Sequence, residues 1–376
     1  MAATDERNCA QEVTDRRFMA AAIRLSQKHA GLTSTNPSVG TLIVRDDGDG
    51  PRIVGRGVTA IGGRPHAEAE ALAEAGELAR GATAYVTLEP CAHHGRTPPC
   101  AHALVNAGVS RVVGAISDPD DRVSGKGYAI LRDAGIDVAE GVLADEAADA
   151  MAGYLIRSLR KRPEVILKLA LSIDGMIGKP GEGQIAITGE IARRQVHLMR
   201  AGVDAVIIGI RTALEDDPEL TVRLPGLSGR SAVRIVLDRQ ARLPTDSKLA
   251  RSARIVPLLL TACAEADAGR KSALERTGAK ILATETFDGR VALPELLEDL
   301  AARGMSRVLV EGGAATAKYF LEEGLVDRIA LFSGAVVIGE GGLAAPIDRN
   351  NMPAGFHLVR QARFGDDGYQ EWTRAI

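Results

Sequence analysis

Four side chains in two short segments constrain this chain more than any other feature. His66 and Glu68 lie in PHAEAEAL, where a helix is predicted to begin, and Cys91 and Cys100 lie in LEPCAHHGRTPPC, each directly after a proline. Zinc favours thiolate and neutral imidazole, and a catalytic zinc site has three protein ligands and leaves the fourth position to water. We therefore expect the fold to bring His66, Cys91 and Cys100 together around one Zn²⁺.

Glu68 is the candidate catalytic residue of this site. Zinc lowers the pKa of a bound water to roughly 7, and a carboxylate that does not bind the metal must then carry the proton to the substrate. A His-x-Glu motif followed by Pro-Cys is the signature of zinc-dependent base deaminases. The spacing departs from that signature, because eight residues, AHHGRTPP, separate the two cysteines where it has two.

A structural zinc site is the main alternative for the same residues. Such sites have four ligands and closely paired cysteines, and neither Cys91 nor Cys100 has a cysteine neighbour at that spacing. The three-ligand count therefore favours a catalytic zinc. The alternative predicts that Glu68→Ala leaves every activity of the chain intact.

The composition limits the partners and the compartment. A net charge of -3 gives no electrostatic footprint for nucleic acid or for an anionic membrane. No stretch approaches the ~18 apolar residues of a membrane span, and the charged N-terminus lacks the apolar core of a secretory signal. With only 4 cysteines, a reducing cytoplasm fits best. We expect a cytoplasmic protein without nucleic-acid or membrane partners.

Strands and helices alternate along the chain in two separate series. The first begins with a helix expected at 14–30, with Thr14 as its N-cap, and we assign it to a domain at 14–150. A helical stretch with a basic cluster then precedes Pro163, after which the alternation restarts in a domain at 163–376. Such alternation predicts three-layer α/β domains with mostly parallel sheets.

The segment VLVEGGAAT is the strongest nucleotide-binding candidate in the second half. A buried strand that runs through two glycines into a helix lets backbone N–H groups approach a phosphate. The segment lacks the G-x-G-x-x-G pattern of dinucleotide-binding folds. From the residues alone, a simple strand–turn–helix junction remains an open alternative.

Several motifs, in order along most of the chain, resemble the family of bifunctional riboflavin-biosynthesis deaminase/reductases. They are TNPSVG, the His66/Glu68 motif, ATAYVTLEPCAHHGRTPPC, SDPD, KLALSIDG, RAGVDAVIIGIRTALEDDPELTVR, RIVLD and VLVEGGAAT. The resemblance implies an N-terminal cytidine-deaminase-like three-layer α/β/α domain and a C-terminal dihydrofolate-reductase-like α/β domain. It also implies two reactions: zinc-dependent deamination of 2,5-diamino-6-(5-phosphoribosylamino)pyrimidin-4-one, then NADPH-dependent reduction of the ribosyl to a ribityl chain.

The resemblance also assigns binding residues. In the first domain it implies substrate contacts from Asn36, His93 and Arg96. In the second it implies NADPH contacts from Ala170, Ala186, Thr212, Asp216, Arg239, Gly313, Ala314, Ala315, Thr316, Ala317, Lys318 and Tyr319. Substrate contacts there are implied for Gln184, Arg200, Leu220, Arg223 and Glu311. Without the family resemblance, the simpler interpretation of Arg200 and Arg223 is that they are solvated surface charges.

The chain departs from the family pattern at a few positions. Gln184 and Ala186 stand where many members have a serine and an aromatic residue, so we expect weaker stacking on the cofactor. Arg239 replaces a small polar residue, and we hypothesise that it meets the NADPH 2′-phosphate; Arg239→Ala would then erode the preference for NADPH over NADH. Asp120 stands where the family often has asparagine, and its role stays open.

Other functions remain as alternatives. One is a single-activity zinc nucleoside or tRNA-type deaminase with a non-catalytic second domain, and another is a reductase alone. A third is a two-domain binding protein with a structural metal. The sequence does not specify the oligomeric state, and we expect a homo-oligomer that binds small phosphorylated pyrimidines.

Overall fold

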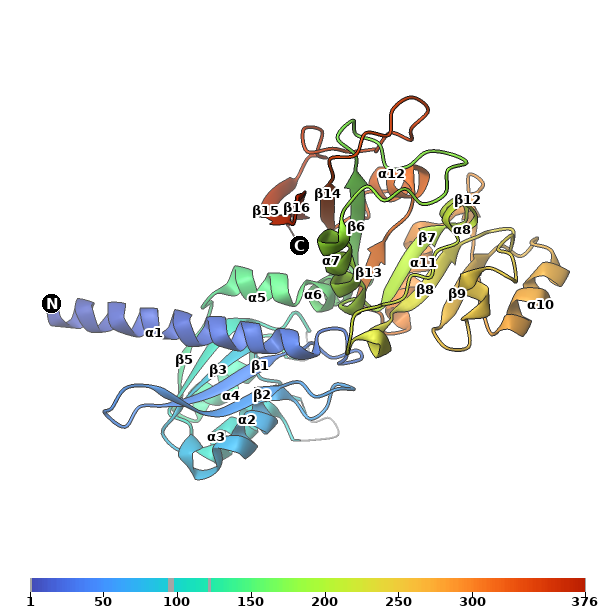
Figure 1. The fold of residues 1–376 in the computed structure, drawn as a ribbon. Coiled ribbons are helices and arrows are strands. Elements are labelled where there is room, and N and C mark those ends of the chain that lie inside the picture. Colours follow the sequence, from blue (N-terminus) through green and yellow to red (C-terminus); the bar gives the residue numbers. More distant parts are fainter. Residues whose placement is uncertain (1, 94–97, 121–122, 376) are drawn as a thin grey trace. The chain divides into compact units, whose positions relative to one another are not determined.

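The computed structural model describes residues 2–93, 98–120 and 123–375, and the chain divides into two compact units, Met1–Arg160 and Lys161–Ile376 (Figure 1). Each unit is described by itself. No helix in the described part of the chain is long and apolar enough to cross a membrane.

The first unit is a five-stranded sheet covered by helices on both faces. Its strand order is β2-β1-β3-β4-β5. Helices α2 and α1 both contact β1, and α2 also packs against α3. The strands are β1 (Gly40–Arg45), β2 (Arg52–Val58), β3 (Thr83–Leu88), β4 (Arg111–Ile116) and β5 (Asp137–Ala139). The helices are α1 (Ala2–Ser26), η1 (Gln27–His29), α2 (Ala67–Ala75), η2 (Gly76–Ala79), α3 (Cys100–Ala107), α4 (Lys126–Asp133), α5 (Ala144–Ala150) and α6 (Ala152–Arg160).

Two expectations for this unit were wrong in detail. The sheet is mixed, because β1 pairs antiparallel with both β2 and β3, whereas β3, β4 and β5 run parallel. The first helix begins at Ala2 and not at Thr14. Ala, Glu, Gln and Arg upstream are good helix formers, so the helix continues through Thr14, whose hydroxyl donates to the carbonyl of Ala10.

The second unit is built on a nine-stranded sheet of order β10-β9-β8-β7-β13-β6-β14-β16-β15, which is parallel from β10 to β14. The strands are β6 (Glu164–Leu171), β7 (Ala205–Gly209), β8 (Val233–Leu237), β9 (Leu258–Ala262), β10 (Lys280–Ala283), β13 (Arg307–Val310), β14 (Arg328–Ser333), β15 (Phe356–Phe364) and β16 (Asp367–Arg374), with a separate β11 (Thr286–Phe287) and β12 (Arg290–Val291) hairpin. The helices are α7 (Glu190–Ala201), α8 (Ile210–Asp216), η3 (Ser228–Arg230), α9 (Lys248–Arg251), α10 (Ala268–Thr277), α11 (Leu293–Ala302) and α12 (Ala314–Glu322).

Strand β7 shows how the sequence produces this layered core. Its residues AVIIG are all buried, as expected for a parallel strand with both faces covered by helices. Side chains alternate between the two faces of a strand, so Val206 and Ile208 join one core cluster, whereas Ala205 and Ile207 join the other. The two clusters lie on opposite faces of the sheet and fix it between the helical layers.

Candidate metal centre and reductase site

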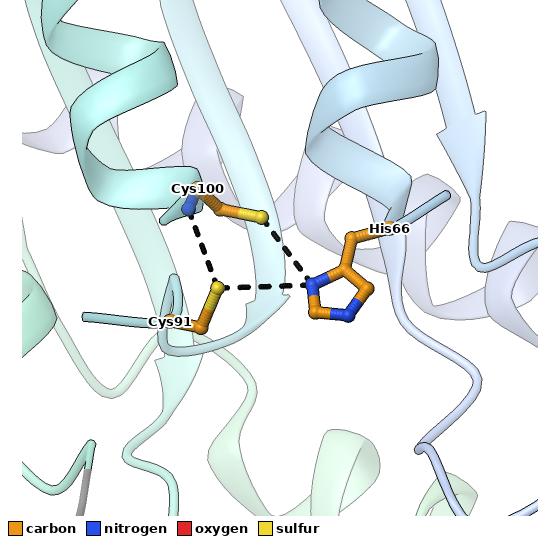
Figure 2. A group of neighbouring side chains, drawn as sticks. All are labelled: His66, Cys91 and Cys100. Atoms are coloured by element: carbon orange, nitrogen blue, oxygen red, sulfur yellow. Dashed lines mark hydrogen bonds between the residues drawn. The ribbon is translucent and has the colours of Figure 1, made fainter. Parts of the chain in front are cut away.

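Three ligand side chains converge beyond the carboxyl end of β3. His66 directly precedes α2, Cys91 follows β3, and Cys100 is the first residue of α3. His66 Nδ1 lies 3.4 Å from Cys100 Sγ and 3.7 Å from Cys91 Sγ (Figure 2). Nitrogen and sulfur ligands of a tetrahedral zinc, at ~2.1 and ~2.3 Å from the ion, lie ~3.6 Å from one another. The three residues therefore fit one Zn²⁺ with its fourth position open.

The electrostatics of the two cysteines differ, because the pKa of Cys91 is lowered, whereas the hydrogen bond of Cys100 to Cys91 and the burial of Cys100 raise the pKa of Cys100. A hydrogen bond from the Cys100 thiol and the interactions with His66 together outweigh burial and lower the pKa of Cys91 to about 4. The backbone N–H of Cys100 also donates to Cys91 Sγ at 3.3 Å. Cys91 does not open a helix, so its thiolate is stabilised by these donors and not by a helix of its own.

Glu68 lies in the first turn of α2 and is 4% exposed. Burial, and next the negative charge of Cys91, raise the pKa of Glu68 to about 7. A carboxyl group with a pKa near neutrality can both accept and release a proton at physiological pH. The geometry thus combines three metal ligands with one buried proton carrier.

The expected substrate residues of this unit lie in loops. The Asn36 Nδ2 group donates to the Gly63 carbonyl at 2.9 Å and so fixes the turn that precedes His66. His93 is half-buried, and its Nδ1 atom has no hydrogen-bond partner among the described residues. That nitrogen is available to a ligand. Arg96 lies outside the described residues.

The expected cofactor residues of the second unit gather at the carboxyl edge of its parallel strands. Ala170 lies near the end of β6, α8 directly follows β7, and Arg239 follows β8. The N–H of Gly313, the N-cap of α12, donates to Thr212 Oγ1 at 3.0 Å. In open α/β sheets, ligands bind beyond the carboxyl ends of the strands, and the start of α12 offers N–H groups to a phosphate.

Two glycines permit the ends of β7 and β13 to pack closely against α12. A Cβ at Gly209 would lie 2.3 Å from Thr316 Oγ1, and a Cβ at Gly312 would lie 2.5 Å from Thr316 Cβ. Only glycine allows the ends of β7 and β13 to approach α12 this closely. Gly312 of VLVEGGAAT therefore has a packing role beside the phosphate contact expected for this segment.

The expected contacts along α12 are not equivalent. Gly313, Ala314 and Ala315 lie at its start, with Ala315 exposed and Ala314 half-buried. The side chain of Ala317 lies in the core, whereas Lys318 pairs with Glu322 at 3.6 Å. The Tyr319 hydroxyl donates to the Val291 carbonyl at 2.9 Å. The first turn is thus the part of α12 with groups free for a ligand.

Arg200 and Glu311, both expected to bind substrate, bind each other. Arg200 Nε and Nη2 donate to the two carboxylate oxygens of Glu311 at 2.5 and 2.9 Å. Burial raises the pKa of Glu311, but the charge and hydrogen bonds of Arg200 outweigh it and hold the pKa below its usual range. Arg200 is therefore no solvated surface charge, and Glu311 is held ionised.

The other expected substrate positions differ in exposure. Arg223 is exposed and pairs with Glu219 at 2.7 Å. The Leu220 side chain is buried in the core, and its φ of 56° is unusual for a residue with a Cβ. Leu220 can therefore meet a ligand only through its backbone.

The departures from the family pattern lie mostly at the surface. Gln184, Ala186 and Arg239 are exposed, and the Arg239 guanidinium lies near Gly289.

Asp216, an expected cofactor contact, is the last residue of α8 and is half-buried, and burial raises the pKa of its carboxyl group.

Lys168 is a residue that the sequence reading missed. It lies on β6, and burial lowers the pKa of its ammonium against the opposing charge of Glu311. Its Nζ lies 5.8 Å from the centre of the Phe332 ring. A lysine inside the apolar run EVILKLALS was the available signal, because a lysine is almost never fully buried unless it is paired.

Comparisons with known proteins agree with a metal centre in the first unit and a reductase site in the second. Residues 12–116 match the cytidine and deoxycytidylate deaminase zinc-binding region, and residues 163–368 match the RibD C-terminal domain. A riboflavin biosynthesis protein RibD from Aquifex aeolicus is 37% identical over 87% of this chain and 88% of its own. RibD from Corynebacterium ammoniagenes is 40% identical over 83% of each chain.

Solved structures give the same relationship. Acinetobacter baumannii RibD superposes with a TM-score of 0.82 at 36% identity and covers 97% of this chain and 100% of its own. A Thermotoga maritima diaminohydroxyphosphoribosylaminopyrimidine deaminase/5-amino-6-(5-phosphoribosylamino)uracil reductase gives a TM-score of 0.83 at 31% identity with the same coverage.

Fold, metal ligands and carboxyl-edge site together define a two-domain enzyme, with a zinc-dependent deaminase unit followed by a reductase unit. The fold class and the family expected from the sequence are confirmed. The chain belongs to the RibD family of riboflavin biosynthesis proteins.

Proposed function

We propose that the chain removes an exocyclic amine from 2,5-diamino-6-(5-phosphoribosylamino)pyrimidin-4-one and then reduces the ribosyl group of the product. The chain is a bifunctional deaminase and reductase of riboflavin biosynthesis, as its relatives are. The observation that carries the deaminase half is the meeting of His66 Nδ1 with two cysteine sulfurs beside the buried Glu68. Asn36 and His93 are the proposed contacts to the pyrimidine and its polar groups, together with Arg96.

Each residue of the metal centre has a distinct task in this proposal. His66, Cys91 and Cys100 would hold Zn²⁺, which would make hydroxide available at neutral pH by lowering the pKa of a water. The Glu68 carboxylate would accept one proton from the attacking water and deliver it to the ring nitrogen, and would then carry a second proton, from the hydroxyl group that this water adds to the ring, to the amine that leaves as ammonia. A pKa of about 7 suits both transfers.

The second unit performs the reduction with NADPH as hydride donor. The start of α12 and Thr212 bind cofactor phosphates, and Arg239 lies beyond β8 for the 2′-phosphate. Glu311, held ionised by Arg200, accepts hydrogen bonds from sugar hydroxyls, and the Lys168 ammonium faces the same region. Hydride transfer depends mainly on such positioning, since the cofactor carries the chemistry.

Glu68→Gln separates the two activities. The amide cannot carry a proton, so ammonia release is expected to fall by ~10²–10⁴-fold, while zinc content and NADPH oxidation with the deaminated substrate stay at the wild-type level. The measurements are a coupled ammonia assay, metal analysis and absorbance at the NADPH band. Undiminished ammonia release from the variant would exclude Glu68 as the proton carrier.

The compartment and the assembly also remain proposals. We infer a cytoplasmic homo-oligomer that acts on small phosphorylated pyrimidines, without nucleic-acid or membrane partners. Light scattering coupled to gel filtration of the full chain measures its mass, and the mass of a single chain would contradict the assembly.

A further inference from the structure

Glu89 is a buried carboxylate that stands two residues before the ligand Cys91. The residue is 3% exposed, and three backbone N–H groups donate to its side chain. Gly125 and Asp118 donate to Oε2 at 3.0 and 3.3 Å, and Gly127 donates to Oε1 at 2.9 Å. All three of these partners are backbone N–H donors.

Two of these donors belong to the beginning of α4. Gly125 is the N-cap of that helix, and Gly127 lies in its first turn. The first N–H groups of a helix have no partner within the helix, and a negative charge there also interacts favourably with the helix dipole. Glu89 therefore caps α4 from a different element, the end of β3.

The end of β3 and the beginning of α4 contact each other directly beside the metal ligand Cys91. A Cβ at Gly127 would lie 1.9 Å from the carbonyl oxygen of Pro90, the residue between Glu89 and Cys91. The Glu89 N–H also donates to the Ile116 carbonyl at the end of β4. The backbone that leads into Cys91 is thus held on one side by β4 and on the other by α4.

We propose that Glu89 is a positioning residue of the metal centre, which fixes Cys91 Sγ within reach of His66 and Cys100 by clamping the end of β3 to α4. The inference rests on the zinc site proposed above. Groups that hold a metal ligand in place typically contribute 10–100-fold to metal affinity. Glu89 acts through the backbone next to Cys91 and has no contact with the reacting atoms.

An amide at position 89 cannot replace the carboxylate. All three neighbours are N–H donors, and a glutamine side chain would turn its own NH₂ group toward at least one of them. An aspartate keeps the charge but is one methylene shorter, so it cannot reach the start of α4 from the same backbone. Glu89→Gln and Glu89→Asp therefore weaken the clamp by different routes.

Asp15→Asn is a matched control in the same unit. Asp15 is 5% exposed and pairs with Arg111 at 2.8 Å. Strands β3 and β4 run parallel. Arg111 lies at the amino end of β4, whereas Glu89 follows the carboxyl end of β3, so Asp15 and Glu89 lie at opposite ends of these strands. The control destabilises the unit without touching the metal centre.

The test measures the zinc affinity of the full chain by competition with a chromophoric chelator. Both Glu89 variants are expected to bind zinc at least ~10-fold more weakly than the wild type, and their Co²⁺-loaded forms to show a changed absorption spectrum. Asp15→Asn keeps the wild-type affinity and spectrum. Reductase activity is expected to be unchanged in all variants, which shows that the second unit is intact. If Glu89→Gln does not fold, the zinc affinity of Glu89→Asp is the deciding measurement.

Wild-type zinc affinity and Co²⁺ spectrum in the folded Glu89 variants would overturn the positioning role. So would an equal loss of affinity in Asp15→Asn, because the effect would then reflect general stability. A wild-type chain that takes up no zinc would instead overturn the proposed metal centre itself.

Discussion

Arg200 and Arg223 carry the same charge but lie in opposite environments. The Arg200 side chain is 13% exposed and makes a two-pronged ion pair with Glu311, which is 8% exposed. The Arg223 side chain is 56% exposed and pairs with Glu219 at the surface. Breaking a buried pair leaves an uncompensated buried charge, whereas an exposed pair contributes little because water and salt screen it.

The two arginines are therefore expected to respond differently to removal. Arg200→Ala should lower the free energy of unfolding of the second unit by about 3 kcal/mol, the low end for a broken buried pair because the Lys168 ammonium remains near Glu311. Arg223→Ala should lower it by less than about 1 kcal/mol. Urea unfolding followed by circular dichroism measures both, and equal losses would contradict the assigned environments.

At the scale of elements, the alternation of strands and helices was enough to predict two α/β units. The expectation of a mostly parallel sheet overlooked the turn-rich DDGDGP, which is too short for the crossover that parallel strands need and so makes β1 and β2 an antiparallel hairpin. The metal ligands were predictable because zinc restricts which residues can bind it. The Arg200–Glu311 pair and the Glu89 clamp were not, since both join residues far apart in sequence.

The close approach of β7 to α12 gives a prediction at this scale. Gly209→Ala places a Cβ 2.3 Å from Thr316 Oγ1, so the end of β7 must move away from the cofactor edge. The Michaelis constant for NADPH should rise and deaminase activity stay unchanged. Adding Thr316→Ala removes the clashing oxygen and should recover part of the stability that Gly209→Ala loses in urea unfolding; a double variant no more stable than Gly209→Ala would contradict this packing.

Glu164 joins three strands at the opposite, amino edge of the same sheet. It begins β6, is 1% exposed, and accepts hydrogen bonds from Arg307 of β13 at 2.6 Å and Arg328 of β14 at 3.1 Å. Burial alone would raise the pKa of Glu164, but the two guanidinium groups outweigh it and lower the pKa.

The lowered pKa predicts an acid-dependent contribution to stability. The stability that the ionised Glu164 contributes is fully present above the unfolded-state pKa of about 4.3, and it is lost as the pH falls through the lower folded-state pKa. The difference in free energy of unfolding between the wild type and Glu164→Gln should thus be largest near neutrality and shrink in acid. Urea unfolding at several pH values measures it, and a difference independent of pH would rule out the ionised triad.

At the scale of the whole molecule, two units with separate cores share one chain. The core cluster of the first unit contains residues between 18 and 151, and the clusters of the second contain residues between 165 and 369. Each unit also has its own chemistry, with metal ligands in the first and a carboxyl-edge cofactor site in the second. The product of the first reaction is the substrate of the second.

The central claim is that one chain performs both steps in this order, and a single assay tests it. The zinc-loaded chain is given 2,5-diamino-6-(5-phosphoribosylamino)pyrimidin-4-one, first without NADPH and then with it, while ammonia and NADPH absorbance are followed. Our account predicts ammonia release without NADPH, followed by one NADPH oxidised for each ammonia released. Absence of ammonia from the zinc-loaded chain, or NADPH oxidation that precedes it, would contradict the account.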